Sequence, residues 1–238
     1  WQADFGEGII MVYIPPGYFF MGPDDGGDDE KRQHKIELDG YWMGKTEVTV
    51  KQYMRCVNDT NSHAPEWLKK ESKHNVETDS NNHYRKMGQA LKGNSHPIVG
   101  VSWNDALEYC KWLTNQKGVT FKLPTEAQWE WAARAGAATP FFYGTRDSDF
   151  PGWANLADAS RRRTYVSWDG GSRVHVRRNY PENCTFPLRD DRFTDKWFIV
   201  DFVAQYRPSP FGLHDMAGNV CEWTRSSYRP YPYRTDDG

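Results

Sequence analysis

Three helix-start signatures limit the fold of this sequence more than any other feature. A hydroxyl residue stands three positions before Gln or Asp at Thr49, Ser102 and Thr125. Such a hydroxyl accepts a hydrogen bond from the backbone of the third helical residue, whose side chain bonds back to the cap. We therefore predict helices that begin after these residues, with the second ending at Gly118 and the third at Gly136.

Apolar residues recur at helical spacing behind each start and predict the buried faces. The first helix is expected to bury Tyr53, Cys56 and Val57, the second Ala106, Tyr109, Cys110 and Leu113, and the third Trp129, Ala132 and Ala133. A polar excursion at 58–95 separates the first two helices, and one short helix is expected within it, around 65–70.

The remaining segments read as short strands and loops. Residues 8–21 hold two β-rich runs broken by Pro15-Pro16-Gly17, which predicts a hairpin, and 35–41 alternates well enough for another strand. From 141 to 210 only short strands and loops are expected. Helices that do not alternate with strands favour an α+β fold over βαβ units.

Composition and charge narrow the class of protein. Eleven Trp, 13 Tyr and 12 Phe offset a hydrophobic content of only 38%, which predicts a loop-rich globular chain packed around aromatic side chains. The net charge of −2 gives no global attraction to nucleic acid, and no run of about 18 apolar residues could span a membrane. The four scattered cysteines and seven histidines show no zinc-ligand spacing.

The stretch 211–224 is the strongest candidate for a metal-binding loop. Asp215 and Glu222 are hard oxygen donors, and Gly212 and Gly218 can take positive φ angles that turn carbonyl groups inward. Two carboxylates with the carbonyls of Gly218 and Val220 would form part of a calcium shell of about six to eight oxygens. The alternative is a tight turn with two solvated acids and Trp223 in the core.

Five motifs in order resemble the formylglycine-generating enzyme (sulfatase-modifying factor) family. They are Met21-Gly22, the run at 41–49, Val101-Ser-Trp-Asn-Asp-Ala106 with Tyr109-Cys110, the run at 123–134, and Gly212-Leu-His-Asp-Met-Ala-Gly-Asn-Val-Cys-Glu-Trp223. The resemblance implies one domain over 1–238 with a variant C-type-lectin-like α+β fold, structural calcium, and an absent C-terminal segment.

The resemblance also implies two calcium sites. The first would use Asp215, Gly218, Val220 and Glu222, the loop already suspected from its chemistry. The second would use Asn155, Leu156, Asp191 and Phe193, with the two non-acidic, non-amide residues acting through their carbonyls.

Departures from the family pattern bear on activity. In its catalytic members two cysteines in a C-terminal stretch bind copper and use O₂ to oxidise a substrate cysteine, and none of the four cysteines here matches that pair. Cys221 stands where the family usually has Trp, so we expect it to be buried. Copper is therefore expected only if a missing tail supplies two cysteines.

Three functions are compatible with these features. The first is a non-catalytic binding or scaffolding domain that recognises a protein or peptide; the second is a copper-dependent formylglycine-generating oxidase completed by a missing tail. The third is an accessory domain of a non-haem iron sulfoxide synthase. Weak oxygen-only calcium sites fill outside the cytoplasm, which favours a periplasmic or secreted protein.

Overall fold

The computed structural model describes residues 1–22, 33–72, 74–77, 91–145, 147–156, Arg192 and 200–234, together with the backbone of two strands at 165–168 and 174–177. Its strands are β1 (Gln2–Asp4), β2 (Ile10–Ile14), β3 (Gly17–Met21), β4 (His34–Leu38), β5 (Tyr41–Gly44), β6 (Tyr165–Trp168) and β7 (Val174–Arg177). Its helices are α1 (Val50–Thr60), the 3₁₀ helix η1 (Glu66–Leu68), α3 (Trp103–Lys117) and α4 (Glu126–Arg134).

All three predicted helix starts are confirmed. Thr49, Ser102 and Thr125 each accept from the third helical backbone N–H, and the residue at that position bonds back to the cap. Gly118 ends α3 with a φ of 70°, whereas α4 ends one residue earlier than expected, at Ala135 with a φ of 48°. The short helix expected around 65–70 is η1.

The expected hairpin between the first two β-rich runs is wrong, although both strands exist. β2 pairs antiparallel with β1 and β5, while β3 pairs with β4. Prolines lack a backbone N–H and cannot close a ladder across the break. The carbonyl of Pro15 instead accepts a hydrogen bond of 3.0 Å from Trp131 Nε1 on α4, so the chain passes from one sheet to the other across this helix.

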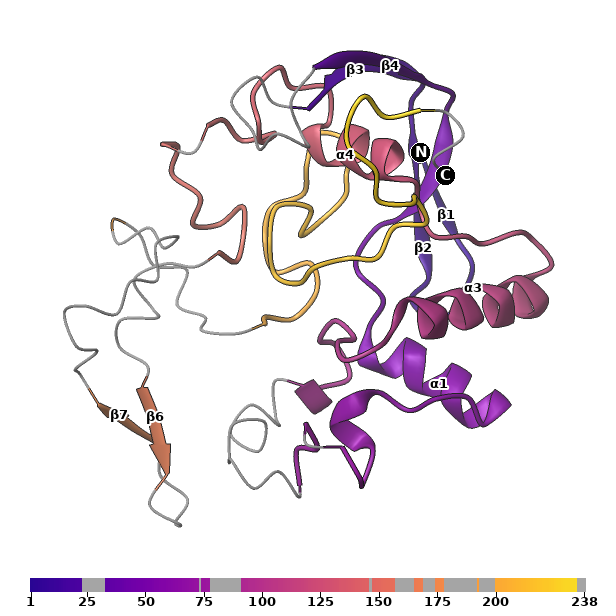
Figure 1. Ribbon diagram of the computed structural model, residues 1–238, viewed down its shortest axis with the longest axis vertical. Coiled ribbons are helices and arrows are strands. Elements are labelled where there is room, and N and C mark those ends of the chain that lie inside the picture. The colour runs from indigo at the N-terminus through magenta and orange to yellow at the C-terminus, as the bar shows by residue number, and fades with distance from the viewer. Residues whose placement is uncertain are drawn as a thin grey trace.

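Figure 1 shows the β3–β4 ribbon lying over α4, with α1 and α3 side by side at the other end of the strands. The ribbon, α4 and the loop after 210 share one core. Its buried members are Val12, Ile14, Phe19, Met21, Ala127, Trp131, Ala132, Leu213 and Met216. A second core lies between α1 and α3 and is formed by Ile9, Tyr53, Cys56, Tyr109, Trp112 and Leu113.

The buried faces of α3 and α4 differ in part from the prediction. Trp131 is buried on α4 in place of Trp129, and Trp112 joins the buried face of α3. Ala106, Cys110 and Trp129 are instead only partly covered, because they line a large apolar pocket. The apolar faces that periodicity predicted for α3 and α4 are therefore wider than the part of each helix that other segments cover.

Candidate functional site

The loop 211–224 is held against the end of β5 by one backbone hydrogen bond, and a second one closes the turn at its own start. His214 N donates to Lys45 O at 3.0 Å, and Ser209 N donates to Leu213 O at 2.7 Å. Leu213 and Met216 are buried in the core on either side of Asp215. The chain turns through left-handed angles at Gly212 (φ 87°), Asp215 (φ 61°) and Asn219 (φ 69°). These anchors fix the Asp215 carboxyl group inside the protein.

Asp215 has one carboxylate oxygen satisfied and one orphaned. Only 5% of the residue is exposed. Its Oδ2 accepts from Ala204 N at 2.7 Å, whereas Oδ1 is buried and has no hydrogen-bond donor. Burial raises the pKa of this carboxyl group. A buried carboxylate oxygen without a hydrogen-bond partner is costly when ionised, so a bound proton or cation would stabilise it.

Glu47 supplies a second buried carboxyl group beside it. The residue precedes α1 and is 8% exposed. Its two carboxyl oxygens accept from Asn219 Nδ2 at 3.1 and 3.3 Å. Burial raises its pKa strongly, and the negative charges of Asp215 and Glu222 add to the effect. Glu47 and Asp215 are close enough to share one proton, but neither can donate when both are ionised.

Glu222 forms the outer edge of this group. The residue as a whole is exposed, yet its carboxyl end lies among the walls of the apolar pocket. Loss of hydration there raises its pKa, and the charge of Asp215 raises it further. One of its oxygens, Oε2, accepts a hydrogen bond from Trp129 Nε1. Glu47, Asp215 and Glu222 therefore concentrate negative charge at one place.

Asn219 ties the loop to two other segments. Its Oδ1 accepts from Asp201 N at 2.8 Å and from Asn155 Nδ2 at 3.0 Å. Its backbone N donates to Asn155 O at 2.9 Å. Sequence reasoning did not single out Glu47 or Asn219, although Asn is the side chain other than Gly that most readily adopts a left-handed turn. That property was the one available signal.

Gly218 serves a different purpose from the one expected. Its φ is not positive. A Cβ at this position would lie 2.3 Å from the carbonyl oxygen of Asn155 and 3.0 Å from Leu156 Cδ2. The glycine thus lets the loop approach the segment 153–156 closely, and the two expected calcium sites adjoin here.

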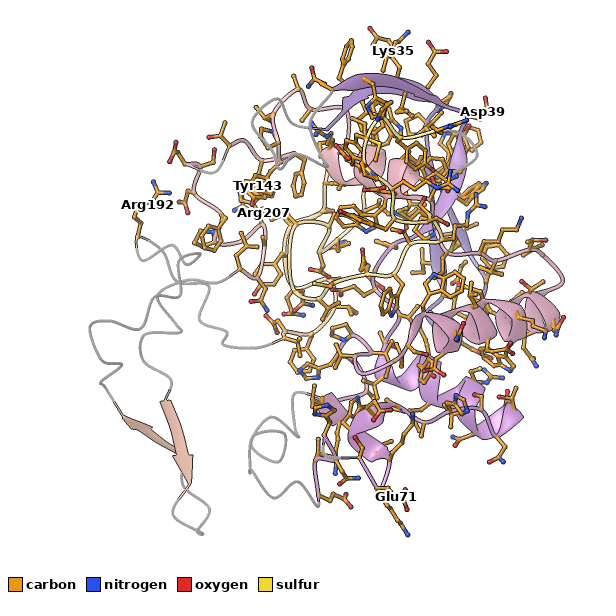
Figure 2. The ribbon with its side chains drawn as sticks, in the orientation of Figure 1. Lys35, Asp39, Glu71, Tyr143, Arg192 and Arg207 are labelled. Carbon is orange, nitrogen blue, oxygen red and sulfur yellow. The ribbon has the colours of Figure 1, made fainter. Side chains whose placement is uncertain are left out.

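The segment that carries Asn155 and Leu156 is fixed by its preceding tryptophan. Trp153 stacks on Tyr143 with ring centroids 6.4 Å apart, and the Arg207 guanidinium lies 5.1 Å from the Trp153 ring centroid. Figure 2 shows Tyr143 and Arg207 close together on one side of the molecule. Asn155 is buried, with an exposed fraction of 8%. The other two expected ligands of the second site, Asp191 and Phe193, lie outside the described residues.

The first predicted ligand set fits calcium in its donor chemistry. Asp215 Oδ1 has no hydrogen-bond partner, Glu222 adds carboxyl oxygens, and Ca²⁺ completes its shell with carbonyls and water. Glu47, which was not in the predicted set, lies beside Asp215. Across the described ranges no three His, Cys, Asp or Glu side chains are gathered closely enough to hold a metal by themselves. Carbonyl oxygens such as those of Gly218 and Val220 would have to supply the rest.

An apolar pocket of about 580 Å³ adjoins the acidic group. Its walls include Glu47, Cys110, Trp129, Cys221 and Glu222. Cys221 is exposed, so the expectation that it would be buried is wrong, because its side chain lies on the wall of an open pocket instead of inside a core. Burial raises the pKa of the Cys110 thiol to about 11. Cys56, Cys110 and Cys221 are all unpaired thiols.

Aromatic residues border the same region and are locked by reciprocal hydrogen bonds. Trp223 Nε1 donates to Val101 O at 3.1 Å, and Trp103 Nε1 donates to Thr224 O at 2.8 Å. Trp103 and Trp223 nevertheless stay 38% and 49% exposed. Trp223 therefore does not plug the core, and Asp215 is not solvated, which removes the alternative of an ordinary surface turn.

The fold and the loop match one family of proteins. A family model described as the sulfatase-modifying factor enzyme 1-like domain matches residues 5–237. The formylglycine-generating enzyme of Mus musculus is 27% identical over 90% of this chain, which spans 57% of that enzyme's length. The inactive C-alpha-formylglycine-generating enzyme 2 of Mus musculus is 28% identical over 96% of this chain and 72% of its own length.

A solved structure shares the fold at lower identity. PvdO from Pseudomonas aeruginosa superposes with a TM-score of 0.67 and 21% identity, over 97% of this chain and 76% of PvdO. In the part of the chain that the structure describes, no helix is both long and apolar enough to cross a membrane.

Proposed function

Because the chain belongs to the sulfatase-modifying factor enzyme 1-like family, we propose that it is a calcium-stabilised formylglycine-generating-enzyme-like domain with a non-catalytic binding or scaffolding role. The observation that carries the calcium part is the buried Asp215 Oδ1, which has no hydrogen-bond partner, in a side chain that interacts with the Glu47 carboxyl group. Bound calcium would supply the positive charge that these oxygens lack. Asp215, Glu222 and the carbonyls of Gly218 and Val220 would hold it, with Glu47 beside them.

The second calcium site belongs to the same proposal. Asn155 and Leu156 lie against the first site through Asn219 and Gly218, so filling one site would rigidify the other. Asp191 and Phe193 complete this ligand set in the sequence. Sites of this kind fill where calcium is abundant, which supports an extracytoplasmic location.

The non-catalytic role is supported by the state of the cysteines. A copper(I) site needs thiolates, which are soft ligands. Cys56 is buried in the α1–α3 core, and Cys110 is kept as a thiol by its surroundings. A relative named as inactive is as similar to this chain as a relative named as an enzyme, so family membership by itself does not imply activity.

The partner proposed for the domain is a protein or peptide. Trp223 on the pocket wall and Trp103, which bonds to Thr224 O, stay exposed, and Tyr228 in the following segment is 82% exposed. Tryptophan and tyrosine dominate the energetic centres of protein interfaces, and the two tryptophans are already held in place. A preordered aromatic surface loses little entropy when it binds.

Calcium removal tests the first part of the proposal. EGTA should lower the melting temperature, since a ligand bound only to the folded state adds about 2.7 kcal/mol at a hundredfold excess over Kd. Glu222→Gln should remove most of this response, because it removes the charge but can still accept from Trp129 Nε1. The matched control is Glu108→Gln on the exposed face of α3, which should respond like the wild type. A melting curve that EGTA leaves unmoved would refute the calcium site.

A copper-dependent oxidase is the second candidate, favoured by the 27% identity to the mouse formylglycine-generating enzyme over 90% of this chain. Residues 1–238 alone should not convert a Cys-x-Pro-x-Arg peptide to the aldehyde with Cu(I) and O₂, as read by mass spectrometry. Turnover that depends on Cys221 would overturn the non-catalytic role. Turnover only in a longer protein that carries two further cysteines would favour the oxidase.

A further inference from the structure

Residues 225–234, here termed the strap, cross the start of α4 and reach the start of β4. Ser226 Oγ accepts from Glu126 N at 2.9 Å, and Tyr231 OH donates to Glu126 Oε1 at 3.1 Å. Tyr233 N donates to His34 Nε2 at 2.8 Å. The strap is therefore fastened at one end to the first turn of α4 and at the other to β4.

The His34 contact works in one protonation state only. A backbone N–H can donate only to a ring nitrogen that has a free lone pair, and a protonated imidazole has none. The Tyr231 ring packs edge-on against His34, with centroids 5.3 Å apart, so the imidazole cannot turn away without breaking that contact as well. Histidine is the side chain whose charge changes near neutral pH.

We propose that His34 is a pH-sensitive latch for the strap: neutral His34 holds Tyr233, and protonation releases the segment. With a neutral imidazole the Tyr233 N–H has its acceptor; with a protonated one it loses this acceptor and a positive charge is left beside it. Cys221, Glu222 and Trp223 lie directly before the strap in the chain and line the apolar pocket.

Among the described residues, the other charged groups at this junction make contacts of their own. Glu126 reaches it through Tyr231 OH, and Tyr233 OH bonds with Ser226 Oγ at 3.2 Å. Lys35, the next residue of β4, pairs with Glu37 and lies over the Tyr18 ring. Arg234 follows Tyr233 in the chain. Tyr233 N donates to His34 Nε2 and to none of these groups.

Hydrogen exchange followed by mass spectrometry tests the latch. With intrinsic rates corrected for pH, strap peptides of the full chain should lose about fivefold protection between about pH 8 and about pH 5. His34→Gln should keep its protection at both pH values, because a Gln amide oxygen accepts at either. His34→Phe, which offers no acceptor, should lack protection at both. His63→Gln, at an exposed histidine, should behave as the wild type.

The variants separate the latch from general acid effects. Acid loosening unrelated to His34 would appear equally in His34→Gln, and that result would overturn the proposal. Unchanged wild-type protection at the lower pH would also overturn it. If His34→Phe fails to fold, the comparison of His34→Gln with His63→Gln still decides the outcome.

Discussion

At the scale of single residues, the loop 211–224, here called the acidic loop, depends on Gly218 for space and on Gly212, Asp215 and Asn219 for its left-handed turns. Asp215 and Asn219 occupy left-handed conformations, which cost little for short polar side chains. Gly218 instead lies against the backbone carbonyl oxygen of Asn155. This oxygen cannot rotate away from an added Cβ as the end of a side chain could. Removal of this space should separate the loop from Asn155.

Gly218→Ala should destabilise the protein by about 3 kcal/mol, at the upper end of overpacking costs, because its Cβ would lie 2.3 Å from Asn155 O. Gly118→Ala is the matched control, since its Cβ would meet nothing within 4 Å and only its φ of 70° is unfavourable. That control should cost about 1 to 2 kcal/mol. Urea unfolding measures both, and equal losses would contradict the crowding argument.

At the scale of elements, the three capped helices are separate modules whose ends are set locally. In α3, Ser102 Oγ accepts from Asp105 N at 3.2 Å while Asp105 Oδ2 accepts from Ser102 N at 2.8 Å. Asp105 also meets His63 from the segment after α1, so the cap joins the two helices. Loss of the cap therefore affects the α1–α3 core.

Ser102→Ala should lower the free energy of unfolding by about 1 kcal/mol, the usual value of an N-cap hydroxyl. Gln116→Ala, exposed near the far end of the same helix, should change it by less than about 0.5 kcal/mol. Thermal melting compares the two. An unchanged free energy of unfolding in Ser102→Ala would show that Asp105 alone maintains the start of α3.

The helix starts could be predicted from sequence because a capping box involves residues only three positions apart. Strand pairing could not, since β2 meets β5 across a span that includes another two-stranded sheet. Periodicity placed Trp129 inside and missed Trp131, because it reports the direction of a face and not which part of that face a neighbour covers. The acidic loop was recognised from its carboxylates and glycines.

At the scale of the whole molecule, four segments meet at the acidic group. Glu47 comes from before α1, Asn155 from the middle of the chain, Asp201 from the start of the last segment and Asp215 from the loop itself. No local pattern links these positions, which explains why Glu47 and Asn219 escaped sequence reasoning. Coordination of calcium by the predicted ligands stays a prediction.

The metal-free protein should become less stable as pH rises. The folded-state pKa of Glu47 lies above its ordinary value, so the folded state binds more protons than the unfolded chain, and stability falls above about pH 5. Glu47→Gln supplies an N–H for Asp215 and cannot ionise. At about pH 8 without calcium it should add about 1 to 3 kcal/mol.

Melting curves at the two ends of this range measure the effect. For a chain of this length, each kcal/mol of added stability raises the Tm by about 2 to 4 °C. Near pH 5 the two proteins should converge, because Glu47 is then protonated in the folded wild type and, like Gln, carries no charge there. Parallel pH profiles for wild type and variant would contradict the shared-proton geometry.

The hydrogen bond from His214 N to Lys45 O bears on how the chain folds during synthesis. It joins residues 169 positions apart and brings Asp215 to Glu47, so the carboxylates can meet only after most of the chain has been made. Contacts of such sequence separation slow folding. The N-terminal strands and the first two capped helices can form before then, and Glu47 stays hydrated until Asp215 arrives. The calcium affinity proposed for this loop should thus arise late in synthesis and in one step.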